Sequence, residues 1–189
     1  MANFIALYDS CVLYPWPLRQ LLMYLALTDL YRAKWTNAIH DEWIRNVLAR
    51  RTDLTQDQLE RTKKLMNENV RDCLVENYEQ LIPALTLPDP NDRHVLAAAI
   101  RSSASVIVTF NLKDFPEKNL KKYGIEAQHP DNFIMHLLDL SSDSVCNAIR
   151  TLRSGLKKPP LTANEYLQSL QRQSLPMTVE ALHKCIDRI

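Results

Sequence analysis

Two short apolar runs, each ending at an acid or an amide, constrain the fold of this chain most strongly. Residues 3–8 stop at Asp9, and the β-branched run at residues 105–110 stops at Asn111. Runs that stay apolar throughout are typical of parallel strands, because helices cover both faces of a parallel sheet. A third, shorter run at residues 125–128 continues the pattern. The sequence therefore predicts strands at these three places in one parallel sheet.

Helical patterns fill the segments between and after these strands. Apolar residues recur there at helical spacing, and the predicted helices cover residues 15–30, 36–50, 55–73, 90–100 and 130–138. Thr55 and Gln58 suit a capping box at the start of the third helix, and Asp89 and Pro90 suit the first positions of the fourth. Strands that alternate with helices predict an α/β fold, with helices on both faces of a central parallel sheet.

The character of the chain changes after Ser141. Three amphipathic helices are predicted beyond it, at residues 142–156, 162–172 and 178–188. We therefore divide the chain into an α/β domain at residues 1–140 and a helical C-terminal extension at residues 141–189. We expect the extension to pack on the domain.

The polar helix at residues 55–73 has only a narrow apolar seam, because charged residues occupy most of its positions. The seam consists of Leu59, Leu65, Met66 and Val70. A helix of this kind rarely fills a core. We predict that its seam forms part of a groove for the helix of a partner protein.

The composition limits which functions are open to the chain. It has 189 residues, of which 46% are hydrophobic, so it can bury one sizeable core. The net charge of +1 gives no bulk attraction for nucleic acid, so any such binding must be local. The candidate basic groups are Arg50 with Arg51, Arg61 with Lys63 and Lys64, the set Lys113, Lys118, Lys121 and Lys122, and Lys157 with Lys158.

Two further patterns bear on the cellular compartment. The four cysteines are scattered and form no Cys-x-x-Cys pair, so we expect reduced thiols rather than a zinc site. The N-terminal segment shows neither a signal peptide nor a membrane-spanning run. We therefore expect a cytoplasmic protein that has no membrane partner.

Acidic and amide side chains follow the predicted strands, where the ligand sites of open α/β sheets lie. They are Asp9 after the first strand, Asn111 and Asp114 after the second, Asp89 and Asp92 at the opening of the neighbouring helix, and Glu42 beside Trp43 on the helix at residues 36–50. Each has a simpler explanation when taken alone, such as a helix cap for Asp89. Together they are like charges that repel unless a divalent cation lies among them, and oxygen ligands select Mg²⁺, Mn²⁺ or Ca²⁺.

Four sequence blocks carry a resemblance to a known family. They are Leu7-Tyr-Asp-Ser-Cys-Val-Leu13, Asp41-Glu-Trp43, Asp89-Pro-Asn-Asp-Arg-His-Val-Leu-Ala-Ala-Ala99 and Val108-Thr-Phe-Asn-Leu-Lys-Asp-Phe115. In this order they resemble the four-acid pattern of PIN-domain nucleases, over about residues 3–140. Within that family the chain looks like the VapC-like toxin ribonucleases of bacterial toxin–antitoxin pairs.

The resemblance implies a PIN-like fold and an endoribonuclease that depends on Mg²⁺ or Mn²⁺, with RNA as substrate and a cognate antitoxin as partner. Hydrolysis without a covalent enzyme intermediate is implied as well, and a homodimer is left open. The acids that match the metal-holding and catalytic positions are Asp9, Glu42, Asp92 and Asp114. Supporting roles go to Ser10, Asp89, Thr109 and Asn111, and RNA phosphate contacts go to Lys113 and Lys118. Asn111 stands where some PIN nucleases have an acid.

Three alternatives compete with a nuclease. A PIN-like module that binds RNA or protein without cutting would have the same fold. A phosphatase that uses Asp9 as a covalent nucleophile needs a second acid two residues on, where this chain has Cys11. A receiver-type signalling domain needs adjacent acids near its start, which the Tyr8-Asp9 segment does not provide. The complete set of acids favours the nuclease.

Overall fold

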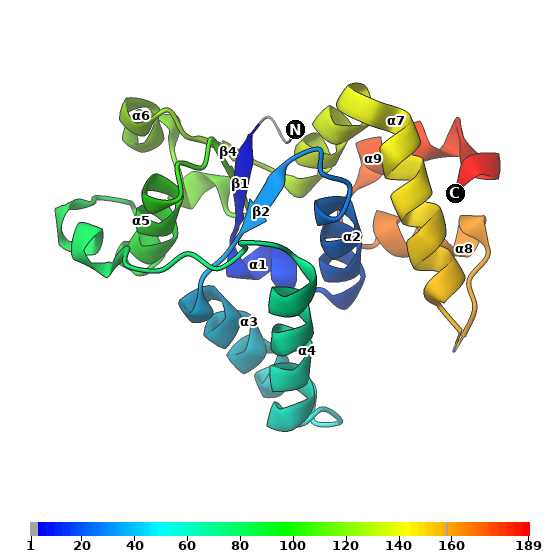
Figure 1. Ribbon diagram of the computed structural model, residues 1–189, viewed down its shortest axis with the longest axis horizontal. Coiled ribbons are helices and arrows are strands. Elements are labelled where there is room, and N and C mark those ends of the chain that lie inside the picture. The colour runs from blue at the N-terminus through cyan, green and yellow to red at the C-terminus, as the bar shows by residue number, and fades with distance from the viewer. Residues whose placement is uncertain (1–3, 158) are drawn as a thin grey trace.

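The computed structural model describes residues 4–157 and 159–189, and a parallel sheet lies at its centre. The strands are β1 (Ile5–Tyr8), β2 (Arg32–Lys34), β3 (Val106–Val108) and β4 (Glu126–Gln128), in the order β2-β1-β3-β4. Each neighbouring pair is parallel. Figure 1 shows α5 and α6 on one side of the sheet and α2 and α7 on the other. The predicted α/β fold is therefore confirmed.

The helices that surround the sheet follow the predicted pattern with adjusted ends. They are α1 (Ser10–Leu13), α2 (Trp16–Ala26), α3 (Asn37–Arg50), α4 (Gln56–Asn69), α5 (Arg93–Arg101) and α6 (Glu117–Leu120). Short 3-10 turns are η1 (Glu79–Ala84), η2 (Pro90–Asp92), η3 (Leu112–Asp114), η4 (Lys121–Tyr123) and η5 (Ile186–Arg188). The capping box of Thr55 and Gln58 at the start of α4 is confirmed, and Thr36 caps α3 by accepting a hydrogen bond from the Ile39 N–H.

Three of the four strands were predicted and one was not. β1, β3 and β4 lie inside the predicted runs, although residue 3 of the first run is outside the described residues. β2 was missed because its sequence is Arg-Ala-Lys, and only Ala33 is buried. Its register against β1 pairs Ala33 with Ala6, so backbone hydrogen bonding rather than side-chain pattern places it in the sheet.

The predicted partner groove along α4 is wrong for most of its seam. Leu59, Met66 and Val70 are buried in the core of this chain, and only Leu65 is exposed. The face of α4 that carries the seam is covered within this chain, because α4 packs against α3. A partner's helix therefore has no continuous apolar surface to bind there.

A cluster of buried aromatic side chains ties the sheet to the C-terminal part of the chain. Tyr8 at the end of β1 stacks on Trp35, with ring centroids 5.9 Å apart. Phe133 meets Tyr8 and Tyr31 edge-on, at 6.5 and 5.1 Å. Edge-to-face and stacked pairs at such distances add to the energy of hydrophobic burial. Because Phe133 belongs to the long helix that follows β4, this cluster fixes that helix to the sheet.

The C-terminal part of the chain consists of α7 (Pro130–Gly155), α8 (Ala163–Gln171) and α9 (Pro176–His183). The two helices predicted on either side of Ser141 are both present in α7, where a kink with non-helical backbone angles at Ser141 separates them. α2 packs against α7 and α8, as Figure 1 also shows, so the extension does pack on the α/β part. Lys158, one of the candidate basic residues, is outside the described residues. Among those described, no helix is both long and apolar enough to cross a membrane.

A buried carboxylate joins the first turn of α7 to the start of α9. Asp131 is 3% exposed, and its two carboxylate oxygens accept hydrogen bonds from the N–H groups of Met177 (2.9 Å) and Thr178 (2.8 Å). These N–H groups lie in the first turn of α9, where an α-helix leaves them without partners of its own. Asp131 therefore caps a helix that is 45 residues or more away in the chain.

We expect Asp131→Ala to destabilise the C-terminal part of the chain. Two hydrogen bonds to a charged acceptor are lost, and this should lower the free energy of unfolding by roughly 2 kcal/mol or more. Thermal melting and hydrogen exchange measure the effect, with faster exchange expected at the amides of α9. Asp139→Ala, which changes an exposed carboxylate on the same helix, is the control. Equal melting temperatures for the two variants would contradict the capping role.

Candidate active site

The end of β1 delivers Asp9 to the carboxyl edge of the sheet. Asp9 comes directly after Tyr8, and its backbone N–H donates to the carbonyl oxygen of Val108 at 3.1 Å. This bond extends the pairing of β1 and β3 by one residue. Asp9 is 3% exposed, so its carboxylate is among the few buried charges of the chain. A buried charge requires hydrogen-bond partners.

Thr109 and Cys11 supply partners for the Asp9 carboxylate. The Thr109 hydroxyl donates to Oδ2 of Asp9 at 2.7 Å, and the Cys11 thiol donates to the same oxygen at 3.0 Å. Thr109 in turn accepts a hydrogen bond from the Asn111 N–H at 2.9 Å. Burial, with the nearby charge of Asp9, raises the pKa of Cys11, so the thiol keeps its proton and remains a donor. The orientation of Asp9 is thus set by side chains from both strand ends.

Glu42 reaches the same region from α3. It is adjacent to the fully buried Trp43, and its Oε1 lies 3.0 Å from Nε2 of His94. Burial alone would raise the pKa of Glu42, but the hydrogen bonds and charge of His94, Ser10 and Arg45 together lower it. Glu42 therefore stays ionised and is held at a defined position by α5 and α1.

Asp92 shows most clearly that the acids lie together. It ends η2 and stands at the first position before α5. Burial, followed by the negative charges of Asp9, Asp89, Asp114 and Glu42 in that order, raises the pKa of Asp92 from 3.8 to about 6. A neighbouring charge shifts a pKa only from a short distance, so these acids lie near Asp92, as the predicted convergence at one edge of the sheet requires. Asp89 also has its predicted capping role, since its side chain accepts from the Asn91 N–H at 2.8 Å.

The acids surround a region rather than a single point. Within residues 4–157 and 159–189, no three His, Cys, Asp or Glu side chains are placed so that they could hold one metal ion together. Charge repulsion acts over longer distances than the roughly 2 Å of a coordinate bond to Mg²⁺. The acids can therefore raise the pKa of Asp92 without meeting at one coordination point. Thr109 and Cys11 restrain Asp9, and His94 restrains Glu42.

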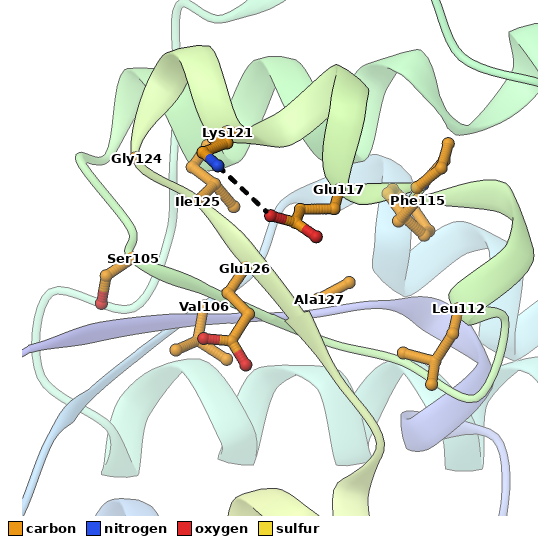
Figure 2. A pocket seen from close by; sticks show the side chains of 11 residues that line it. Ser105, Val106, Leu112, Phe115, Glu117, Lys121, Gly124, Ile125, Glu126 and Ala127 are labelled. Carbon is orange, nitrogen blue, oxygen red and sulfur yellow. Dashed lines mark ion pairs between the residues drawn. The ribbon is translucent and has the colours of Figure 1, made fainter.

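The predicted phosphate contacts divide between two places. Lys113 lies on η3 beside Asn111 and Asp114, next to the acids. Lys118 lies on α6, which Figure 1 shows well away from α1 and α3. A hollow of about 710 Å³ lies beside α6 and β4, and none of the four predicted catalytic acids lines it. Figure 2 shows the ion pair of Glu117 and Lys121 among its lining side chains.

Sequence reasoning missed two side chains of this site. His94 follows Asp92 by two residues within the same block, but a single histidine without ligand spacing gave no signal. Cys11 was considered only as the residue that replaces an acid, whereas in the structure its thiol donates to Asp9. The His94 contact lies beyond a local pattern, since His94 and Glu42 are 52 positions apart, and Cys11 lies 3.4 Å from Thr109, which is 98 positions away.

Comparison with known proteins identifies the family. A model described as "PIN domain" matches residues 6–113, a span that contains Asp9, Glu42 and Asp92 and ends one residue before Asp114. The chain belongs to the PIN domain family. A second model, described as "VapC50 C-terminal domain", matches residues 130–184, which hold α7, α8 and α9. The resemblance to PIN-domain and VapC-like proteins is therefore confirmed.

A curated relative agrees with both matches. The chain is 44% identical over 96 residues to a protein of Mycobacterium tuberculosis named "Putative ribonuclease VapC50". The alignment covers 51% of this chain and 56% of that protein, so it spans about half the length of the relative. No solved structure matches the chain.

We expect Asp92→Asn to stabilise the metal-free PIN domain at neutral pH. The pKa of Asp92 is raised from 3.8 to about 6, so ionisation costs the folded state free energy. Each pKa unit is worth about 1.4 kcal/mol, and because Asp92 is only half-buried, screening reduces the expected gain to on the order of 1 kcal/mol.

The pH dependence gives the sign of this effect. Below about pH 3 the carboxyl group is largely neutral in both states, so Asp92 carries little cost there. As the pH rises towards 6, the unfolded chain ionises first and stability is lost, and above 6 the full cost remains. The gain from Asp92→Asn should therefore be present at pH 7 and largely lost near pH 3 in thermal melts in EDTA. Asp139→Asn is the control, and the same gain at both pH values would contradict the assignment.

Proposed function

We propose that this chain is a metal-dependent endoribonuclease that hydrolyses phosphodiester bonds of RNA at the acidic edge of its sheet. The observation that carries the proposal is the group of acids around Asp92, in a chain of the PIN domain family. The name of the curated relative, a ribonuclease, supports the same activity. Since the alignment covers 56% of that protein, the activity and the RNA substrate are our extension to this chain.

The donor set at this edge fits Mg²⁺ or Mn²⁺. All four proposed ligands, Asp9, Glu42, Asp92 and Asp114, are carboxylates, and hard divalent cations prefer oxygen donors. Mg²⁺ usually keeps several of its waters in proteins, so acids that surround a region can hold it partly through water. The pKa of Asp92 is raised by burial first and then by the charges of neighbouring acids, which a divalent cation would neutralise.

The side chains of the site have separate tasks in this proposal. A bound divalent cation supplies charge neutralisation at the phosphate and lowers the pKa of water. Thr109 and Cys11 orient Asp9, and His94 orients Glu42. Both carboxylates are therefore already fixed in position before RNA binds. Ser10 supports Glu42 through its hydroxyl group. Lys113, on the exposed η3 turn, is proposed to contact an RNA phosphate.

The alternative is a PIN-like module that binds RNA or protein without cutting it. One observation favours it: among the described residues, no three acidic groups meet at a single coordination point. The two functions differ in whether a labelled RNA is shortened.

We expect the purified protein to cleave RNA in the presence of Mg²⁺ or Mn²⁺ and to stop when EDTA is added. Loss of one carboxylate removes several kcal/mol of charge stabilisation, and each 1.4 kcal/mol is tenfold in rate, so Asp9→Asn should cut activity roughly 100-fold or more. Asp139→Asn should retain the activity of the parent protein, since Asp139 is exposed on α7. Cleavage that persists in EDTA, or an active Asp9→Asn variant, would refute the metal-dependent mechanism, whereas RNA that stays intact with both metals would leave the binding module.

We further propose that the protein acts in the cytoplasm as the toxin of a toxin–antitoxin pair and binds a cognate antitoxin. The VapC50 C-terminal domain match over residues 130–184 supports this role. Expression of the protein alone should arrest growth, whereas Asp9→Asn and Asp92→Asn should be tolerated at equal protein levels. Growth curves with immunoblots measure this, and equal toxicity of all three proteins would contradict it. A homodimer remains open to measurement by light scattering.

A further inference from the structure

A second polar hollow adjoins the acidic edge of the sheet. It has a volume of about 510 Å³ and lies between α1 and the C-terminal half of α3. Its lining includes Ser10, Tyr14, Asn46, Arg50 and Asn111. We call this hollow the Tyr14–Arg50 groove. Cys11 also lines the groove, and its thiol donates to the Asp9 carboxylate, so one end of the groove lies beside Asp9.

Asn46, Ala49 and Arg50 of α3 line the groove, and Glu42 lies one turn before Asn46 on the same helix. Residues four apart lie on one face of a helix, so Glu42, Asn46 and Arg50 form a single row. With a rise of 1.5 Å per residue, this row extends roughly 12 Å from the acids to the end of α3. Its charge changes along the way, from the carboxylate of Glu42 through the amide of Asn46 to the guanidinium of Arg50.

The environment of Arg50 differs from that of its neighbour Arg51. The Cζ atom of Arg50 lies 5.6 Å from the ring centroid of Tyr14, and Arg50 forms no ion pair within the described residues. Arg51 instead pairs with Asp53, with 2.6 Å between Nη2 and Oδ2. A guanidinium that stacks on an aromatic ring keeps its N–H edge free for a phosphate or carboxylate. Arg50 is therefore a preorganised and unneutralised cation at the far end of the groove.

We propose that the Tyr14–Arg50 groove binds the backbone of single-stranded RNA beside the scissile bond, with Arg50 on a phosphate. Tyr14 acts as a positioning residue that holds the guanidinium, and Asn46 offers amide groups along the path. The proposal rests on the proposed nuclease function, because it takes the acids as the site of cleavage. RNA is favoured over an acidic protein segment because the groove leads directly to the acids and presents polar groups rather than apolar anchors along its row.

Binding measurements test the groove without depending on cleavage. The probe is a labelled, unstructured RNA of about 12 nucleotides, bound to proteins that all carry Asp9→Asn and observed by fluorescence anisotropy in Mg²⁺ at several salt concentrations. Loss of one phosphate contact should make the slope of log K against log salt less negative by about 0.7. We expect this change for Arg50→Gln, together with a roughly tenfold weaker affinity from one lost charge-assisted hydrogen bond.

Arg51→Gln is the matched control, because it removes the same charge one residue later from an exposed pair with Asp53. It should leave both affinity and slope unchanged. Tyr14→Leu should weaken binding because Arg50 loses its stacking partner, and Tyr14→Phe should restore it. Thermal melting of each variant shows whether the fold is intact.

The outcomes separate this proposal from the proposed function. RNA binding that depends on Arg50, in a parent protein that cuts no RNA, would support the groove and refute the nuclease. Cleavage by the parent protein with equal affinity and slope for Arg50→Gln and Arg51→Gln would overturn the groove and leave the nuclease. Absence of RNA binding would also overturn the proposal, and an acidic protein segment would then be the ligand to test for Arg50. In the cleaving protein, Arg50→Gln should raise KM with kcat unchanged.

Discussion

The pairing of β1 with β3 is the interaction on which the candidate site depends. Its register places Tyr8 opposite Val108, and the next hydrogen bond runs from the Asp9 N–H to the Val108 carbonyl oxygen. Thr109 then meets the Asp9 carboxylate at 2.7 Å. A shift of one residue would turn the side chains after both strands to the opposite face. The same backbone ladder that builds the core therefore also sets the position of the first acid.

The clustered acids lower the stability of the metal-free folded state. Asp92 has a raised pKa because burial and four other carboxylates disfavour its charge, and this is a cost to the metal-free folded state. Apolar packing offsets the cost, since the helix that follows Asp92 carries five consecutive buried residues from Val95 to Ala99. Asp9 and Glu42 obtain further compensation from hydrogen bonds. Strain of this kind is expected where side chains are arranged for a ligand rather than for stability.

Local patterns predicted the elements that local physics determines, and failed where distant contacts decide. The two central strands, the capping box of α4 and the cap at Asp89 were readable because apolar periodicity and capping chemistry act within a few residues. β2 could not be predicted, because Arg32 and Lys34 give it no apolar pattern and its place in the sheet follows from backbone pairing with β1. The acids could be listed from the sequence, but their orientation depends on His94 and Cys11, whose contacts follow from packing. The division of the chain at residue 140 stays a prediction, since α7 runs across it with a kink.

The position of single charges explains how a chain with a net charge of +1 can favour a polyanion. Screening limits exposed charges to about 8–10 Å at physiological salt, so the total charge matters less than the groups that line one path. Arg50 and Arg51 are neighbours in sequence and looked equivalent there, but Asp53 neutralises only Arg51. Arg50 lies over the Tyr14 ring and forms no ion pair within the described residues. An RNA backbone in the groove would meet this cation at one end and the acids at the other, and the acids repel phosphate unless a divalent cation lies between them. In the proposed groove, binding at the two ends would be coupled, because a cation that neutralises the acids would also reduce their repulsion of an RNA phosphate.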